Sequence, residues 1–202
     1  MDAFFEVREP DELDLEDVCK RIERLTTGMM RFWQAPQGWA PVASVGLLTN
    51  AMLDEQASLS VSLARWIDAT SPGDLILAWA NLGALVEGQL KLLLSVYLDD
   101  YTSHAAVALT PKGKKMYENS PEKLMLAKLQ QFCDDQVWDA GDVWDDYIGR
   151  VRTRRNAIHT FKQMDVGTFA DWRKEVRMHL SFIRHVNSLL PYPDDMYEPR
   201  EY

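Results

Sequence analysis

The chain has 202 residues, of which 47% are hydrophobic and 26% are charged, and its formal net charge is -9. These proportions are typical of a globular protein with a sizeable core, and they exclude a largely disordered chain. The acidity also argues against general nucleic-acid binding, because that binding depends mainly on neutralising phosphates. A nucleic acid would need a locally basic surface.

The sequence predicts an all-α fold, since alternating strand patterns are almost absent. We expect a single helical domain over residues 1–202, with N-terminal helices in 11–70 packed on the remainder. Residues 1–12 are rich in carboxylates and lack the basic and apolar parts of a signal peptide, so we expect a cytoplasmic protein. Cys19 and Cys133 lie far apart without a metal-binding pattern, which favours reduced thiols. We assign no metal and no cofactor.

Proline and glycine divide the chain into a predicted bundle of about six helices. Each predicted helix has an apolar stripe at helical spacing. The fourth also begins with a favourable N-cap, a serine followed by proline. The expected helices lie at about residues 13–33, 41–68, 74–101, 121–137, 142–162 and 169–190.

The predicted helix over residues 74–101 is the most hydrophobic, and we expect it to be the long central helix of the bundle. Its length raises a membrane-spanning alternative. Charged residues within it count against that alternative, because they are costly in a bilayer, so we expect no membrane association. A carboxylate at Glu87 needs a partner if it is buried. The candidates are an arginine from 152–155 and Lys91, one helical turn away.

Residues 110–116 form a predicted loop with three lysines, at positions 112, 114 and 115. These lysines could reach toward a phosphate backbone. A solvated loop is the more common explanation for such a group. The sequence leaves both explanations open.

The fifth predicted helix carries the most concentrated positive charge. Four arginines, a lysine and a histidine fall within residues 150–162 without a carboxylate, directly after an aspartate-rich stretch. At roughly 100° per residue, several polar side chains share a sector beside the apolar arc, where they could line a groove. These are Arg152, Arg155, Asn156 and His159. Arg154 instead projects among apolar side chains, where an unpaired guanidinium is costly, so it needs a partner.

The basic stretch contains the run Arg154-Arg155-Asn156-Ala157-Ile158-His159. This run resembles the R-x4-6-H motif of the HEPN superfamily, helical domains that include metal-independent ribonucleases of toxin-antitoxin and antiviral defence systems. The resemblance covers about residues 72–190, which would be a HEPN-like core. In that family the arginine usually precedes a polar residue, often asparagine. Here Arg154 has the four-residue spacing, Arg155 precedes the asparagine and Arg152 has the six-residue spacing, so the motif arginine is left open.

The resemblance implies an endoribonuclease in which the ribose 2'-hydroxyl attacks the adjacent phosphate. Imidazole exchanges a proton near neutral pH, so His159 would be the general acid or base. The planar donor fork of arginine suits a phosphate, so Arg154 or Arg155 would stabilise the transition state. Asn156 would orient the phosphate or the imidazole. The substrate-binding side chains would be Arg150, Arg152 and Lys162.

The resemblance also implies RNA, a second copy of the chain and a cognate antitoxin as partners, since the family often forms its site across a dimer. DNA would be spared because it lacks the 2'-hydroxyl. One alternative is a non-catalytic helical module that binds a nucleotide, RNA or a partner protein. It would be favoured if a glutamate-arginine pair at Glu87 sequesters every arginine near His159. The other alternative is a purely structural charge network around a packed histidine.

Overall fold

The computed structural model describes residues 7–159 and 163–202, so Lys162, a predicted substrate-binding residue, lies outside the described residues. The expected all-α class is confirmed: the described chain forms helices joined by loops and short 3-10 turns, with one isolated bridge in place of any sheet. Its α-helices are α1 (Leu15–Trp33), α2 (Val42–Thr49), α3 (Leu53–Ser62), α4 (Pro72–Val96), α5 (Leu98–Val107), α6 (Leu126–Gln136), α7 (Trp144–Arg155) and α8 (Phe169–Leu189).

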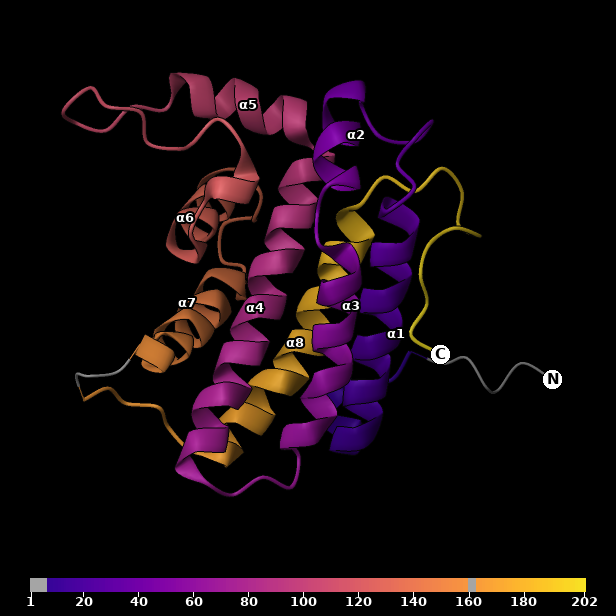
Figure 1. Ribbon diagram of the computed structural model, residues 1–202, viewed down its shortest axis with the longest axis vertical. Helices are drawn as coiled ribbons and strands as arrows, with labels where there is room; N and C mark the ends of the chain where they lie inside the picture. The colour runs from indigo at the N-terminus through magenta and orange to yellow at the C-terminus, as the bar shows by residue number, and fades with distance from the viewer. Residues whose placement is uncertain (1–6, 160–162) are drawn as a thin grey trace.

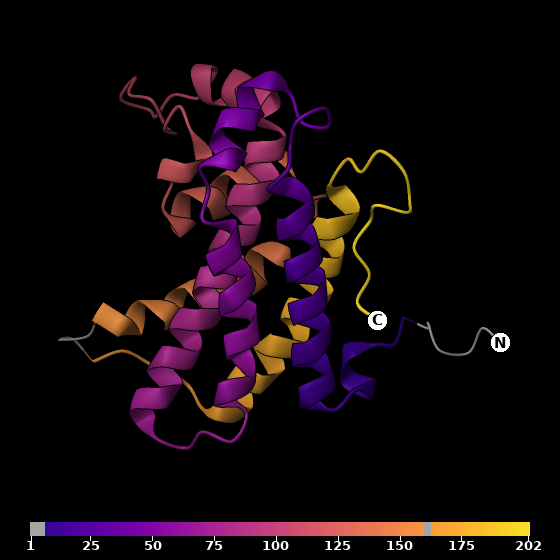
Figure 2. The same cartoon turned by 45° about the vertical axis from the view of Figure 1, so that its right-hand side comes forward.

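Four of these helices, α1, α3, α4 and α8, lie side by side (Figure 1 and Figure 2). Each packs against two others, in the cyclic order α1, α3, α4, α8. Helices α6 and α7 pack against α4 on the other side, and α7 also contacts α8. The apolar stripes meet in one core, in which the largest buried side chains include Trp33, Trp79, Trp172 and Phe182. Helix α4 therefore contacts elements from both sides of the molecule.

Helix α4 begins at a strong local signal and ends without one. The hydroxyl of Ser71 accepts a hydrogen bond from the Asp74 backbone N–H at 3.1 Å, and Pro72 occupies the first turn. At its other end the backbone of Tyr97 leaves the helical region, with ψ at 41°. The Tyr97 hydroxyl donates to the Leu189 carbonyl at 2.6 Å, which ties this break to the end of α8. Among the described residues, none of the helices combines the length and apolarity that a bilayer crossing needs.

The expectation of about six helices is wrong, because two of the expected helices are each divided. The stretch 41–68 forms α2, α3 and a 3-10 turn, Leu63–Trp66, and the stretch 74–101 is divided into α4 and α5. The fifth expected helix is also shorter than predicted. Helix α7 ends at Arg155 and continues as a 3-10 turn, Asn156–His159. The divisions shorten the helices without changing the class of the fold.

Candidate functional site

Helix α7 and the 3-10 turn after it carry the predicted site residues. Tyr147, Ile148 and Val151 are fully buried and fix the helix against α4 and α8. The helix ends where the backbone N–H of Asn156 donates to the Arg152 carbonyl. Because these three side chains anchor one face of α7 in the core, the polar side chains on its other faces are held in defined directions.

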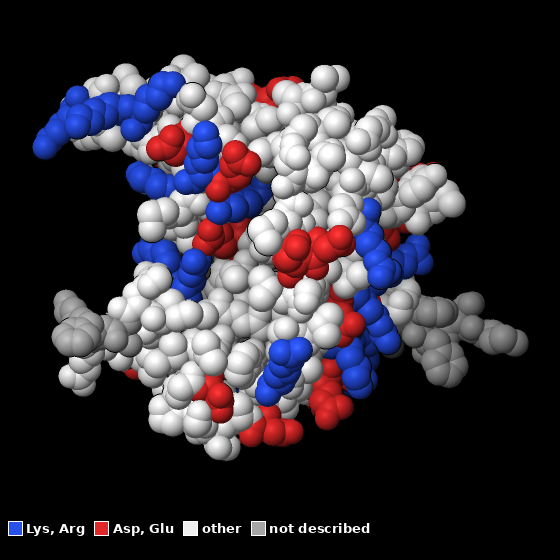
Figure 3. Space-filling view, viewed as in Figure 1, with Lys and Arg blue, Asp and Glu red and all other residues white. Residues whose placement is uncertain are grey.

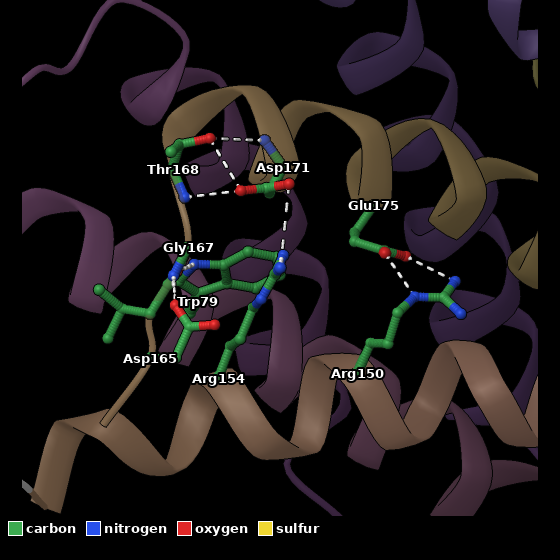
Figure 4. Close-up of polar contacts among 9 residues, drawn as sticks. Trp79, Arg150, Arg154, Asp165, Gly167, Thr168, Asp171 and Glu175 are labelled. Carbon is green, nitrogen blue, oxygen red and sulfur yellow. Dashed lines mark hydrogen bonds and ion pairs between the residues drawn. The ribbon is translucent and has the colours of Figure 1, made fainter. Parts of the chain in front are cut away.

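Two arginines of α7 pair with two carboxylates of α8 (Figure 4). Arg150 donates to both carboxylate oxygens of Glu175, with Nε at 2.6 Å and Nη2 at 3.2 Å. One turn further on, Nη2 of Arg154 lies 3.9 Å from an Asp171 oxygen. The spacing is four residues on both helices and the order is reversed, so the two pairs form an antiparallel ladder. The hydrogen bond to Glu175 raises the pKa of Arg150, so its guanidinium remains charged.

Arg154 has the partners that its predicted position requires. Its guanidinium carbon lies 4.8 Å from the centre of the Trp79 ring, and only 20% of its side chain is exposed. The Trp79 indole N–H in turn donates to the Val166 carbonyl at 2.8 Å. Gly167 passes directly over the guanidinium with φ at 63°, and a Cβ there would lie 2.9 Å from the Arg154 Cζ. Arg154 thus connects α7, α4 and the segment that leads into α8 (Figure 4).

Arg155 is held by α4. Its guanidinium forms a hydrogen-bonded ion pair with Glu87, and the Lys91 ammonium donates to the other Glu87 oxygen at 2.7 Å. Both candidate partners of Glu87 are therefore present together. Burial raises the pKa of the Glu87 carboxyl, but the hydrogen bonds from Arg155 and Lys91 outweigh this and lower it below its ordinary value. The Arg155 side chain crosses α4 at Gly83, where a Cβ would lie 2.8 Å from that of Arg155.

Three of the predicted site residues keep their polar atoms available. Within the described residues, the side chains of Arg152, Asn156 and His159 form no hydrogen bond or ion pair. Asn156 and His159 are exposed and Arg152 is partly exposed. Asn156 comes one α-helical turn after Arg152, and His159 comes one turn of the 3-10 segment after Asn156, so this spacing places the three side chains on one side. The structure thus separates the basic stretch into three anchored arginines and one exposed polar row, Arg152-Asn156-His159.

An open groove of about 540 Å³ lies between α6, α7 and residues 164–165, and Arg152 is the one member of the exposed row that lines it. Arg150, Arg152 and Arg154 line it together with Asp145, from the same helix, and Asp165. The groove therefore carries mixed charge, and His159 is not among its lining residues. No cluster of three or more His, Cys, Asp or Glu side chains suited to a metal ion occurs in the part of the chain that the structure describes.

Trp79, Asp171 and Glu175 are the site contacts that sequence reasoning missed. A signal for the two carboxylates was present, because Asp171 and Glu175 have the same four-residue spacing as Arg150 and Arg154. Side chains four residues apart share one face of a helix, so two such sets of opposite charge can form two pairs where the helices pack together. Nothing local indicates Trp79, since its contact with Arg154 depends on how α4 and α7 pack.

Comparison with known proteins gave no match to a family model, to a curated protein or to a solved structure.

Proposed function

We propose that this chain is a metal-independent endoribonuclease of the HEPN type. The observation that carries the proposal is the exposed row Arg152-Asn156-His159 at the end of an anchored helix. A phosphate-binding group, an amide and an acid-base group share one accessible side, which is what cleavage of an RNA phosphodiester requires. The ion pairs of Arg150, Arg154 and Arg155 support the proposal, because they fix the orientation of α7 and therefore of the exposed row.

The anchoring of the other arginines favours Arg152 as the motif arginine. It stands seven positions before His159 and so has the R-x6-H spacing, the longest that the HEPN pattern allows. Arg154 and Arg155 have the shorter spacings, but their guanidiniums are bound to Asp171 and Glu87. We assign these two to positioning of α7 and the phosphate contact to Arg152.

In the proposed reaction, the His159 imidazole takes the proton of the ribose 2'-hydroxyl. The 2'-oxygen attacks phosphorus, and the bond from phosphorus to the 5'-oxygen breaks. Arg152 stabilises the negative charge that develops on the phosphate oxygens. The leaving 5'-oxygen takes a proton from water or from a second imidazole. The products are a 2',3'-cyclic phosphate and a 5'-hydroxyl.

We also propose that a second copy of the chain completes the site, since one imidazole holds one role at a time. A dimer that brings two α7 ends together would supply a general base from one protomer and a general acid from the other. A cognate antitoxin in the cytoplasm would then act by covering the exposed row. Both partners, the second copy and the antitoxin, are inferred from the proposed family, so evidence against that family would also remove them.

Cleavage of a single-stranded RNA in EDTA tests the proposal. The wild-type chain should produce fragments with a 2',3'-cyclic phosphate, and His159→Ala should lower kcat by about 100-fold or more. His104→Ala is the matched control, because His104 is also an exposed histidine but lies on α5. Arg152→Gln should reduce kcat by about 100-fold, and Arg65→Gln, at another exposed arginine, should not.

An RNA with a single 2'-deoxy nucleotide at the cleavage position should resist cleavage. Equal cleavage by wild-type protein and His159→Ala would refute the assigned role of the histidine. A chain that binds RNA without cutting it, in every variant, would establish the second candidate function, a non-catalytic RNA-binding module. The anchoring of Arg150, Arg154 and Arg155 favours this second candidate in part, because among the described residues only Arg152 of the four arginines in 150–155 is left without an ion pair.

A further inference from the structure

Between α5 and α6 the chain forms a structured hairpin over residues 108–116, here named the lysine arm. Its two sides are joined by backbone hydrogen bonds from Thr110 to Lys114 at 2.8 Å and from Met116 to Ala108 at 3.0 Å. A turn at Gly113, with φ at 71°, closes the tip. The predicted loop is therefore a hairpin with an ordered backbone, from which the lysine side chains extend.

The lysine arm concentrates unneutralised positive charge in an acidic chain. Lys112, Lys114 and Lys115 are exposed, and none of them forms an ion pair within the described residues. Lys115 donates only to the neutral side chain of Asn119, at 3.0 Å. Lysines 112, 114, 115, 123 and 128 are five of the nine lysines in a chain of net charge -9. The arm itself holds three of these lysines, and they give an acidic chain a local positive charge that can attract an anion.

The lysine arm and the end of α7 lie on the same side of the molecule. In Figure 1 and Figure 2 the arm projects at the upper left and the end of α7 at the lower left, with α6 set back between them. Figure 3 shows Lys and Arg side chains over the tip of the arm and a hollowed surface below it. A single strand that touched both the arm and the end of α7 would cross this hollow.

We propose that the lysine arm is a second RNA contact, which holds phosphates of a single strand several nucleotides from the bond that is cut. The inference rests on the proposed ribonuclease function. Lysine binds phosphate as a point charge without reading bases, so the contact is independent of sequence. It also explains how so acidic a chain would retain RNA, because the arm supplies charge that the mixed-charge groove does not.

RNA binding tests the arm separately from cleavage when His159→Ala is present in every protein compared. Binding of a fluorescein-labelled 20-nucleotide RNA is followed by anisotropy as salt rises from about 50 to about 200 mM. Changing Lys112, Lys114 and Lys115 to Gln should weaken binding by about tenfold or more and reduce the salt slope by about 2, because each phosphate contributes about 0.7. The matched control removes three exposed charges elsewhere, with Lys20, Arg65 and Lys174 changed to Gln.

Cleavage then separates the two proposals. With His159 restored, the arm variant should cleave a dinucleotide at the wild-type rate and lose kcat/KM only on the 20-nucleotide RNA. Equal loss of RNA binding in the arm variant and the control would overturn the inference. So would binding of anionic lipid vesicles in place of RNA, with the arm lysines required, since Val107 and Leu109 are exposed next to them. Failure of the wild type to cleave either RNA would instead overturn the ribonuclease, while the anisotropy still decides whether the arm binds RNA.

Discussion

Replacement of Glu87 by glutamine tests whether α4 holds the site helix through charge. The variant keeps the shape of the side chain but removes the carboxylate shared by Arg155 and Lys91. Breaking a fully buried ion pair costs about 3–5 kcal/mol, and an exposed pair contributes about 0–1 kcal/mol. The side chains of Glu87, Arg155 and Lys91 are 19%, 28% and 29% exposed. We therefore expect the free energy of unfolding to fall by about 1–2 kcal/mol at pH 7, as measured by urea unfolding followed by tryptophan fluorescence.

The pH dependence gives a second measurement of the same contact. The pKa of Glu87 is lowered in the folded protein, so its contribution is present above the ordinary glutamate value of 4.5 and is lost as the pH falls through the lowered value. The wild type and Glu87→Gln should therefore converge in stability below that range. Lys91→Gln serves as control and should cost only about 0.2–0.5 kcal/mol. Additivity of Glu87→Gln and Arg155→Met within about 0.3 kcal/mol would refute the coupling.

Three further changes test separate features of the fold. Gly83→Ala should destabilise the protein by about 1–3 kcal/mol in urea unfolding, because the new methyl group meets the Cβ of Arg155, which cannot rotate away. Thr168→Ala should cost about 1 kcal/mol and speed amide exchange in the first turn of α8, since it removes the hydroxyl of the capping box. Cys19 and Cys133 should resist thiol reagents at pH 8 until the protein unfolds, because burial raises the pKa of both thiols, that of Cys19 to about 12.

Each of these changes has its own check. Gly46→Ala also adds a methyl group to a helix but meets nothing within 4 Å, so it should leave stability equal or raise it by up to about 1 kcal/mol. A Gly83 variant as stable as that control would contradict the close approach of α4 and α7. Thr168→Ser should retain the cap, and an equal loss in both Thr168 variants would exclude capping as the cause. Labelling of either cysteine in folded protein, at the rate of a free thiol, would contradict its burial.

Patterns of neighbouring residues predicted the class of the fold and the position of several helices. The first and last expected helices, 13–33 and 169–190, match α1 and α8 to within two residues, because caps and apolar spacing mark their limits. The break at Tyr97, between α4 and α5, is not marked by a nearby proline or glycine in the sequence. It is stabilised instead by a hydrogen bond to Leu189, which is remote in sequence. Boundaries made by tertiary contacts were therefore missed.

The same distinction applies to the candidate site. Helical spacing alone grouped Arg152, Asn156 and His159 on one side, but it also placed Arg155 there, which the structure binds to Glu87 instead. Burial cost alone indicated that Arg154 needs a partner. Which carboxylate binds which arginine depends on α4 and α8, whose positions beside α7 are set by packing of the whole bundle. The sequence could therefore predict which residues lie on the α7 surface, but not which of their side chains are paired with carboxylates of other helices.

The ladder between α7 and α8 also orders events during synthesis of the chain. The ribosome releases Arg150 and Arg154 before it releases Glu175 and Asp171, so a growing polypeptide carries two uncompensated guanidiniums until the last long helix emerges. Helix α1 also packs against α8, and the interval between its synthesis and that of α8 is longer still. The end of α7 would therefore take its ordered position only after α8 has emerged and folded beside it.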